Sequence, residues 1–289
     1  MDIKALLAGL AFAFMWSSAF TSARIIVTNA PPLTISALRF LIAGLIAVTI
    51  ARVLGQSLRL TPQQWRLTIL FGICQNALYL GLNFIAMQTV EASLAAIIAS
   101  SLPLWVALAG WMISGETIRP LGVAGLVAGI AGVALIMGTR LSGGVDPVGV
   151  ALCGIGVLAL TFATMAVRGA SSGGNVMTVV GFQMLVGSAA LWVPALLFET
   201  WEVNWSPKVV MALLYTIFVP GLLATVIWFW LVRRIGTTRA ATFHFLNPFL
   251  GVAIAALFLG EALGTLDLVG VVIITFGILA VQLSKARPA

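Results

Sequence analysis

Uncharged polar side chains recur inside the long apolar stretches of this sequence, and three of them share one helical face. Asn76, Tyr79 and Asn83 lie at positions i, i+3 and i+7, the spacing that places side chains on one side of an α-helix. Their amide and hydroxyl groups can hydrogen-bond a small polar solute, or they can bond neighbouring helices. The stripe therefore predicts either the lining of a polar cavity or a set of interhelical contacts.

Two matching proline motifs interrupt other apolar stretches. In one, a pair of serines stands just before Pro103; in the other, His244 and Asn247 precede Pro248. Each proline lacks a backbone N–H and frees the carbonyl four residues earlier. Two bent helices could offer acceptors to an ammonium group and act as gating hinges, or the bends could serve packing alone.

Two ionisable residues fall inside apolar stretches. His244 is the only histidine; it could carry a proton near neutral pH, or it could stay neutral and hydrogen-bonded, since no carboxylate accompanies it. Arg39 stands near the start of its stretch, so we expect its side chain to snorkel to the membrane surface. The alternative is that Arg39 attracts the carboxylate of a solute.

Further candidates stand at corresponding depths of other stretches, and they complete a set of expected cavity-lining residues. Together with the groups above, the set is Trp16, Ser17, Asn76, Tyr79, Asn83, Ser100, Ser101, Thr161, Thr164, Phe243, His244 and Asn247, with Pro103 and Pro248 as hinges.

Two other patterns suggest structure and not binding. Glycines at helical spacing between 122 and 132, with Gly270 and Gly277, predict close helix packing. Glu116 and Glu261, each after a glycine, are expected to cap or anchor helices.

Catalytic chemistry has no support in these residues. An enzyme would need a nucleophile with its base, a pair of acids, or metal ligands at workable spacing. The sequence has one histidine, no His-Glu-x-x-His motif, no nucleotide-binding loop and no carboxylate pair inside the apolar stretches. We therefore expect no enzyme activity, no metal, no cofactor and no ATP-driven pumping.

The elements that carry these residues are expected to cross a membrane. Hydrophobic residues make up 61% of the 289-residue chain and charged residues 8%, and the mean hydropathy is +1.15. A spanning helix needs about 20 mostly apolar residues, and the sequence predicts ten, at 5–26, 34–54, 66–88, 92–113, 119–138, 147–168, 176–198, 208–231, 238–259 and 266–284. The expected fold is an all-α integral membrane protein without a soluble domain.

The basic residues predict the orientation of these helices. With the N-terminus in the cytoplasm, eleven of the 15 Lys and Arg residues fall on the inner side, as the positive-inside rule requires. The even number of spans then places both termini in the cytoplasm, in a membrane of the bacterial inner-membrane type. The basic residues are spread over many loops instead of forming one patch, so nucleic acid is not an expected partner.

An internal repeat divides the chain into two halves of five helices, 1–140 and 141–289. Residues 145 positions apart match: Pro103 with Pro248, Gly115 with Gly260, and Glu116 with Glu261. Since five is odd, the second half must enter the membrane in the opposite direction. Inverted repeats are the usual architecture of secondary transporters, which bind solute between the halves and expose it to each side in turn. Duplication for a stable bundle alone is the simpler alternative.

The paired motif, a proline within a span and Gly-Glu at its end before a glycine-rich span, resembles the ten-helix drug/metabolite transporters of the EamA type. More narrowly, the sequence is similar in character to YddG-like amino-acid exporters. The resemblance covers essentially the whole chain, and it implies an inner-membrane carrier of small metabolites working in export.

The polar groups narrow the expected solute. A phosphorylated solute would need several basic residues in the cavity, whereas only Arg39 is near, and a cation exporter would want a glutamate in the first helix, where none stands. An amino acid or a related neutral metabolite, with an apolar body, fits best. A proton-coupled exporter of other metabolites or drugs is the alternative; the protein is expected to act as a monomer in the bilayer.

Overall fold

The computed structural model describes residues 3–115, 117–166, 173–235, 240 and 242–285, and every regular element in these ranges is helical. The first half holds five spans, two of them in segments. They are α1 (Ile3–Val27); α2 (Pro32–Val53); α3 (Pro62–Phe71), η1 (Gly72–Leu80) and α4 (Gly81–Ala86); α5 (Ala92–Ser100) and α6 (Leu102–Ser114); and α7 (Pro120–Ser142).

The second half repeats this order. Its elements are α8 (Pro147–Ala166); α9 (Val176–Phe198); α10 (Pro207–Thr216), η2 (Ile217–Leu223) and α11 (Ala224–Ile235); η3 (Thr242–Leu246) and α13 (Asn247–Leu259); and α14 (Thr265–Lys285). In the described ranges nine helices are long and apolar enough to cross a membrane, and Phe243–Leu259 is apolar but shorter. The predicted all-α, multi-span fold is confirmed; part of the ninth expected span, at 238–259, lies outside the described residues.

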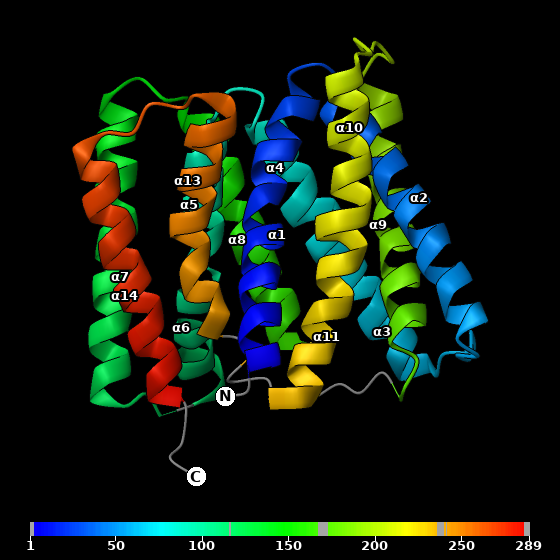
Figure 1. The fold of residues 1–289 in the computed structure, drawn as a ribbon, viewed down its shortest axis with the longest axis horizontal. Helices are drawn as coiled ribbons and strands as arrows, with labels where there is room; N and C mark the ends of the chain where they lie inside the picture. The colour runs from blue at the N-terminus through cyan, green and yellow to red at the C-terminus, as the bar shows by residue number, and fades with distance from the viewer. Residues whose placement is uncertain (1–2, 116, 167–172, 236–239, 241, 286–289) are drawn as a thin grey trace.

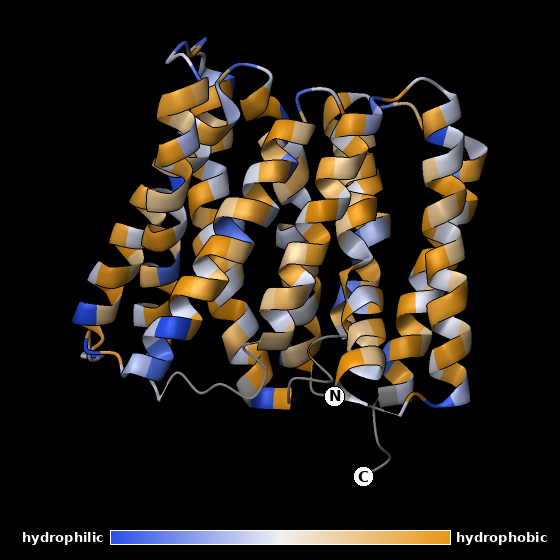
Figure 2. Cartoon of the chain, turned by 180° about the vertical axis from the view of Figure 1, so that it is seen from behind, coloured by the Kyte–Doolittle hydropathy of each residue, from blue (hydrophilic) through white to orange (hydrophobic). Residues whose placement is uncertain are grey.

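The chain enters and leaves the helical bundle at one edge. Figure 1 shows α1 beginning at the edge where α14 ends. Because five spans separate the start of α1 from the start of α8, the second half begins at the opposite edge. Figure 2 shows apolar residues along the helices, with hydrophilic residues largely near their ends and a few near their middles.

Local sequence explains where many helices begin and end. Proline stands in the first turn of several helices, where its missing N–H costs no hydrogen bond, and Thr61 and Gln64 form a capping box at α3. Gly115 and Gly260, 145 positions apart, end α6 and α13 with φ of 64° and 69°. Glycine adopts this left-handed conformation without the strain that a Cβ would bring.

The predicted glycine packing is confirmed between α7 and α14, which lie side by side. A Cβ built on Gly125 would lie 2.7 Å from the carbonyl oxygen of Gly277, and one on Gly277 would lie 2.7 Å from that of Gly125. Without side chains at these positions, the two backbones approach closely enough for extensive van der Waals contact.

A second pair, α2 and α9, is joined at both ends by side chains that cap the partner helix. The Glu199 carboxylate, after α9, accepts hydrogen bonds from the backbone N–H groups of Leu33 and Thr34 in α2, at 2.8 and 2.7 Å. Gln56 Oε1, after α2, accepts from the N–H of Met177 in α9 at 2.9 Å. Each half thereby satisfies N–H groups that a helix start leaves unpaired.

Two π-helical segments occupy matching places in the halves. Each position of η2 lies 145 residues after its counterpart in η1, so the repeat seen in the sequence extends to this uncommon backbone form. π-Helical turns inside α-helices are frequent at functional sites. Both segments stand in the middle of their spans.

Candidate functional site

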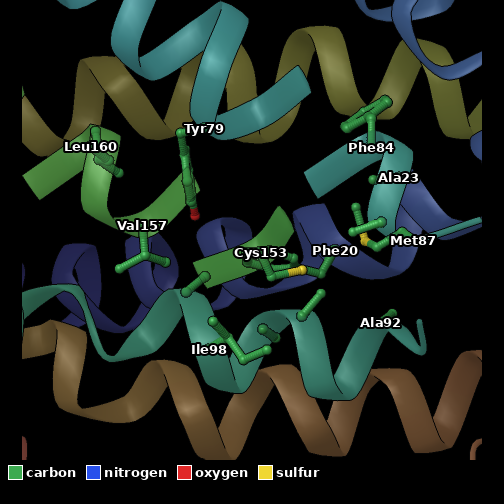
Figure 3. Packing of buried hydrophobic residues seen from close by; sticks show 14 of the residues in the cluster. Phe20, Ala23, Tyr79, Phe84, Met87, Ala92, Ile98, Cys153, Val157 and Leu160 are labelled. Carbon is green, nitrogen blue, oxygen red and sulfur yellow. The ribbon is translucent and has the colours of Figure 1, made fainter. Parts of the chain in front are cut away.

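A cavity of about 80 Å³ is lined by residues of both halves and is large enough for several water molecules. Both π-helical segments line it, together with α1, α2, α4, α9, α10 and α11. Its polar lining side chains are Trp16, Arg39, Gln75, Asn76, Tyr79, Asn83, Gln183, Thr216 and Thr225, and its apolar ones include Phe20, Phe40, Phe84, Met87, Met184 and Ile217. Figure 3 shows four of these lining residues, Tyr79, Phe84, Phe20 and Met87, within the buried hydrophobic packing.

The predicted stripe of Asn76, Tyr79 and Asn83 lines this cavity. Both asparagines also make structural hydrogen bonds: Nδ2 of Asn76 donates to the carbonyl oxygen of Gln183 at 2.9 Å, and Nδ2 of Asn83 donates to that of Tyr79 at 2.7 Å. The two alternatives drawn from the sequence, cavity lining and interhelical bonding, are therefore both present in Asn76. Asn83 keeps Oδ1 without a partner among the described residues.

Arg39 does not snorkel, which corrects the expectation from its place near the start of α2. Its side chain is buried and lines the cavity, with the guanidinium carbon 4.2 Å from the centre of the Phe40 ring and 4.7 Å from that of Phe84. Such stacking of a cation on aromatic faces is favourable when the cation is desolvated. No carboxylate of the described residues lines the cavity.

Some lining residues that the repeat relates to one another differ in polarity. Arg39 of α2 and Met184 of α9 are counterparts 145 positions apart, and both line the cavity. Likewise Asn76 in η1 corresponds to Gly221 in η2, and both are lining residues. The first half thus contributes charged and amide groups at positions where the second half contributes apolar or small ones.

A second polar cluster forms where α1 meets the broken ninth span. Asn247 Nδ2 and His244 Nδ1 are 2.9 Å apart, and the hydroxyl of Ser17 lies 3.5 Å from Asn247 Oδ1. The imidazole is packed against the rings of Phe12, Trp16 and Trp228, with centroids 5.3, 6.2 and 5.3 Å away. A small cavity of about 10 Å³, lined by Trp16, Ser17, Ser100 and Asn247 among others, adjoins this cluster.

Five predicted lining residues belong to neither cavity: His244, which lies in the cluster beside Asn247, and Ser101, Thr161, Thr164 and Phe243. The hydroxyls of Ser101, Thr161 and Thr164 donate to carbonyl oxygens of their own helices, those of Ile98, Val157 and Leu160, and this local bonding uses the donor that a solute would need. Phe243 is buried against α1, where its ring occupies the space in which a Cβ on Gly9 would stand. In this structure these side chains make structural contacts, and their role in lining the path stays a prediction.

Both predicted hinge prolines stand at breaks in their spans. Pro103 lies in the first turn of α6, after the interruption at Ser101, and Pro248 lies in the first turn of α13, after the 3-10 segment η3. Neither lines the central cavity. Their sequence position predicted the interruption of the helices, and a role in gating stays a prediction.

The edge where α1 ends carries a wider cavity of about 590 Å³, lined by Arg24, Lys208, Glu91 and Glu261 among others. A guanidinium N–H of Arg24 donates to the carbonyl oxygen of Met87, and Met87 in turn lines the central cavity. The contact between Arg24 and Met87 therefore lies between the two spaces.

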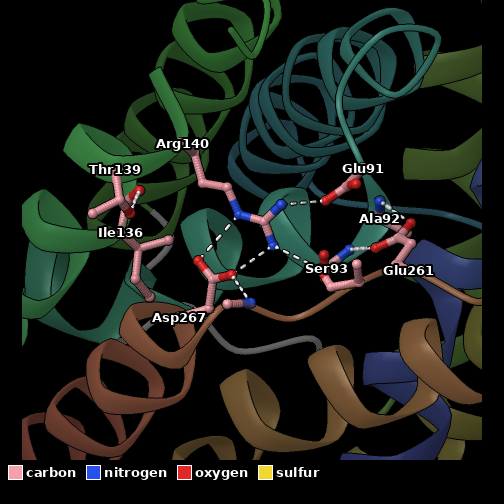
Figure 4. A network of polar contacts seen from close by, with 10 residues as sticks. Glu91, Ala92, Ser93, Ile136, Thr139, Arg140, Glu261 and Asp267 are labelled. Carbon is pink, nitrogen blue, oxygen red and sulfur yellow. Dashed lines mark hydrogen bonds and ion pairs between the residues drawn. The ribbon is translucent and has the colours of Figure 1, made fainter. Parts of the chain in front are cut away.

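Polar contacts close the same edge beside that cavity (Figure 4). Arg140 forms ion pairs with Glu91 at 2.6 Å and with Asp267 at 2.8 Å. Glu261 accepts hydrogen bonds from the N–H groups of Ala92 and Ser93 at 2.8 and 2.9 Å. Glu261 is thus a cap for α5, as expected of a structural glutamate; its counterpart Glu116 lies outside the described residues.

Sequence inspection missed the cavity residues of the second half, Gln183, Met184 and Thr216, and also Gln75 of the first. Glutamine inside an apolar span was an available signal for two of them. Gln75 stands next to Asn76, and the α-helical spacing assumed for this span does not place neighbours on one face. The π-helical turn brings both to the cavity.

Comparison with known proteins identifies the architecture. The model of the EamA-like transporter family matches the chain twice, at residues 3–138 and 147–283. Among curated relatives, "Uncharacterized transporter YvbV" of Bacillus subtilis is 27% identical, with 95% of this chain and 90% of that protein covered. "Uncharacterized inner membrane transporter YedA" of Escherichia coli strain K12 is 26% identical, with 94% and 88% covered.

A solved structure described as "Crystal structure of protein" has the same fold, with a TM-score of 0.71, 22% identity and 98% of both chains covered. The two family matches together span nearly the whole chain. The chain is a multi-pass membrane protein that belongs to the EamA-like transporter family, whose members are transporters and not enzymes.

Proposed function

We propose that the protein is a secondary transporter that carries amino acids, including aromatic and other apolar ones, and related small neutral metabolites across the bacterial inner membrane by alternating access, in the direction of export. The observation that supports this most directly is the cavity that residues of both halves line. Sites of secondary transporters lie near the middle of the membrane at such repeat interfaces.

The lining suits a small solute with a polar head and an apolar body. Amides of Gln75, Asn83 and Gln183 stand in the same cavity as Phe20 and Met184. A few placed polar groups in a mainly apolar pocket orient a ligand and supply specificity. A solute with several phosphate groups would need more cationic side chains than the one that lines the cavity in the described part of the chain.

Orientation and driving force complete the proposal. We place the junction of the halves between residues 140 and 141. Both termini lie in the cytoplasm in this proposal, the orientation that the positive charges of the loops favour. The edge cavity near Arg24 then faces the outside. Without a nucleotide-binding loop in the sequence, the solute gradient drives transport, and the ligand shifts the populations of the two access states.

Proton-coupled export of other metabolites or drugs is the second candidate function. The observation behind it is His244, which lies beside Asn247 and packs against α1. The side chains packed around its ring are aromatic or amide groups, and none of those contacts is a carboxylate. Proton relays in membranes ordinarily pair such a histidine with acidic groups, so the uncoupled carrier is favoured.

The test is counterflow, with the purified protein in the membrane of liposomes that are loaded inside with an unlabelled amino acid. Uptake of the same labelled amino acid, above that of protein-free liposomes and without a pH gradient, is the expected result. Absence of uptake for every amino acid tested, by protein that is monodisperse after reconstitution, would contradict the proposal.

A matched pair of variants shows whether the solute passes through the cavity. Ala19 lines it, whereas Ala11, two turns earlier on α1, is exposed. Ala19→Trp adds an indole ring to a space of about 80 Å³ and should reduce counterflow at least about tenfold, since the solute loses its place. Ala11→Trp should transport normally, and equal transport by both variants would show that the path lies elsewhere.

A further inference from the structure

Arg39 is a buried cation for which the described residues supply no ion pair or hydrogen bond. Its side chain is 7% exposed, and neither Nε nor Nη2 has a hydrogen-bond partner among the described residues. Burying a charge without pairing it is costly, and ionisable residues inside membrane spans are kept mainly where they serve function. Stacking on Phe40 and Phe84 holds the guanidinium plane but leaves its N–H donors unused.

The Arg39 side chain lines the transport cavity. Among the described residues it is the only charged one in that lining, so the cavity attracts a negative group. A planar guanidinium offers paired N–H donors that match the two oxygens of a carboxylate, which gives both attraction and orientation.

Apolar lining residues of the second half fit the rest of such a solute. Met184, the counterpart of Arg39 in the repeat, lines the cavity from α9, beside Ile217 and Pro220 of the second half. Asn83 Oδ1 has no hydrogen-bond partner among the described residues, and it is an acceptor that an ammonium N–H could satisfy. The cavity therefore combines groups for a charged head with apolar residues for a side chain.

We propose that Arg39 binds the carboxylate of the transported solute, so that the carrier selects carboxylate-bearing solutes with an apolar body over their amine and amide analogues. This inference rests on the proposed transport function and specifies its substrate. Arg39 is then the residue that sets specificity, and its missing protein partner is the cargo itself.

The experiment compares three solutes that share one side chain: phenylalanine, phenethylamine, which lacks the carboxylate, and 3-phenylpropionate, which lacks the ammonium. In the wild-type protein, 3-phenylpropionate should compete with labelled phenylalanine, and phenethylamine should compete at least about tenfold less well, since charged hydrogen bonds discriminate by that order. Stronger competition by the amine would overturn the inference while the transporter proposal stands.

Variants of Arg39 test the residue itself. Arg39→Gln should lose carboxylate competition by about tenfold to a hundredfold, and Arg39→Lys, which keeps the charge without the paired donors, should fall between. Arg52→Gln, an exposed position on the same helix, is the matched control and should behave as wild type. Unchanged carboxylate preference in Arg39→Gln would mean that water alone solvates the guanidinium, and the inference fails.

Thermal stability separates binding from a structural role. Because the charge is unpaired without solute, Arg39→Met should melt at an equal or higher temperature than wild type in detergent; a structural cation would lower it. In wild type, 3-phenylpropionate should raise the melting temperature, as ligands of the folded state do, and in Arg39→Met it should not.

The melting temperature also distinguishes failure of the carboxylate site from failure of the transport proposal. If no solute gives counterflow but 3-phenylpropionate stabilises wild type and not Arg39→Met, the carboxylate site stands and the transport proposal falls. If 3-phenylpropionate and phenylalanine both leave the wild-type melting temperature and the counterflow signal unchanged, the inference is overturned.

Discussion

Nδ2 of Asn83 donates to the carbonyl oxygen of Tyr79 at 2.7 Å, one turn earlier in the same span, and this bond turns Oδ1 of Asn83 away from any partner of the described residues. Both residues line the central cavity. An unpaired buried acceptor costs about 1–3 kcal/mol, a cost that a bound ammonium or hydroxyl group would remove. The hydrogen bond to the Tyr79 carbonyl therefore leaves Oδ1 of Asn83 as an acceptor for a hydrogen-bond donor of the solute.

Replacement of Asn83 by Leu should remove this acceptor without unfolding the protein. We expect a loss of amino-acid counterflow of at least about tenfold, the effect of one hydrogen bond to a charged group, with a melting temperature near that of wild type. Counterflow of a labelled amino acid, measured in the same kind of liposomes for both proteins, is the check. Transport equal to wild type would remove Asn83 from the site.

Gly125 offers a test of the α7 and α14 contact. Gly125→Leu would force a side chain into the space 2.7 Å from the Gly277 carbonyl oxygen, so the helices must separate, at a cost of about 1–3 kcal/mol or more. A lower melting temperature and a smaller monodisperse fraction are expected. Gly138 on the same helix has open space around its Cβ direction, and Gly138→Leu should leave both measurements unchanged.

Arg140 should stabilise the edge where α5, α7 and α14 meet. Arg140→Ala would leave the buried Asp267 carboxylate without its cation, which should lower stability by about 1–3 kcal/mol. Asp267 also accepts a hydrogen bond from the Gly264 N–H, so it stays partly satisfied. In a double-mutant cycle with Asp267→Asn, the two effects should be less than additive; full additivity would show that the ion pair contributes nothing.

His244 should prove dispensable for energy coupling. His244→Gln keeps a polar group beside Asn247, and no carboxylate faces the imidazole from α1 or α11. Counterflow by this variant should have the same dependence on pH as wild type between pH values of about 5.5 and 8, the range in which a histidine titrates. A pH response present in wild type and absent from the variant would instead support proton coupling.

Periodicity and the repeat predicted the helical fold well because lipid leaves the backbone few alternatives. The breaks at Pro103 and Pro248 and the glycine contacts of α7 and α14 also follow from residue type alone. These features depend on local chemistry that the sequence carries directly.

Side-chain direction was harder to predict. Thr161 and Ser101 stand at plausible depths, yet their hydroxyls bond their own helices. Arg39 stands near a helix start, where snorkelling is common, but the packing of α2 against α4 and α9 encloses it. The π-helical turn of η1, which brings Gln75 and Asn76 to the cavity together, has no sequence signature comparable to proline.

The difference between Arg39 and Met184 has a consequence for how such a carrier can arise. A protein of half this length, paired with an inverted copy of itself, would bring either two guanidinium groups or none to the shared space, because its subunits would be identical. Joining the copies in one polypeptide lets each mutate alone. Unlike a pair of identical subunits, the fused chain holds an arginine at one of the two equivalent places and a methionine at the other, and can so bind one end of an asymmetric molecule.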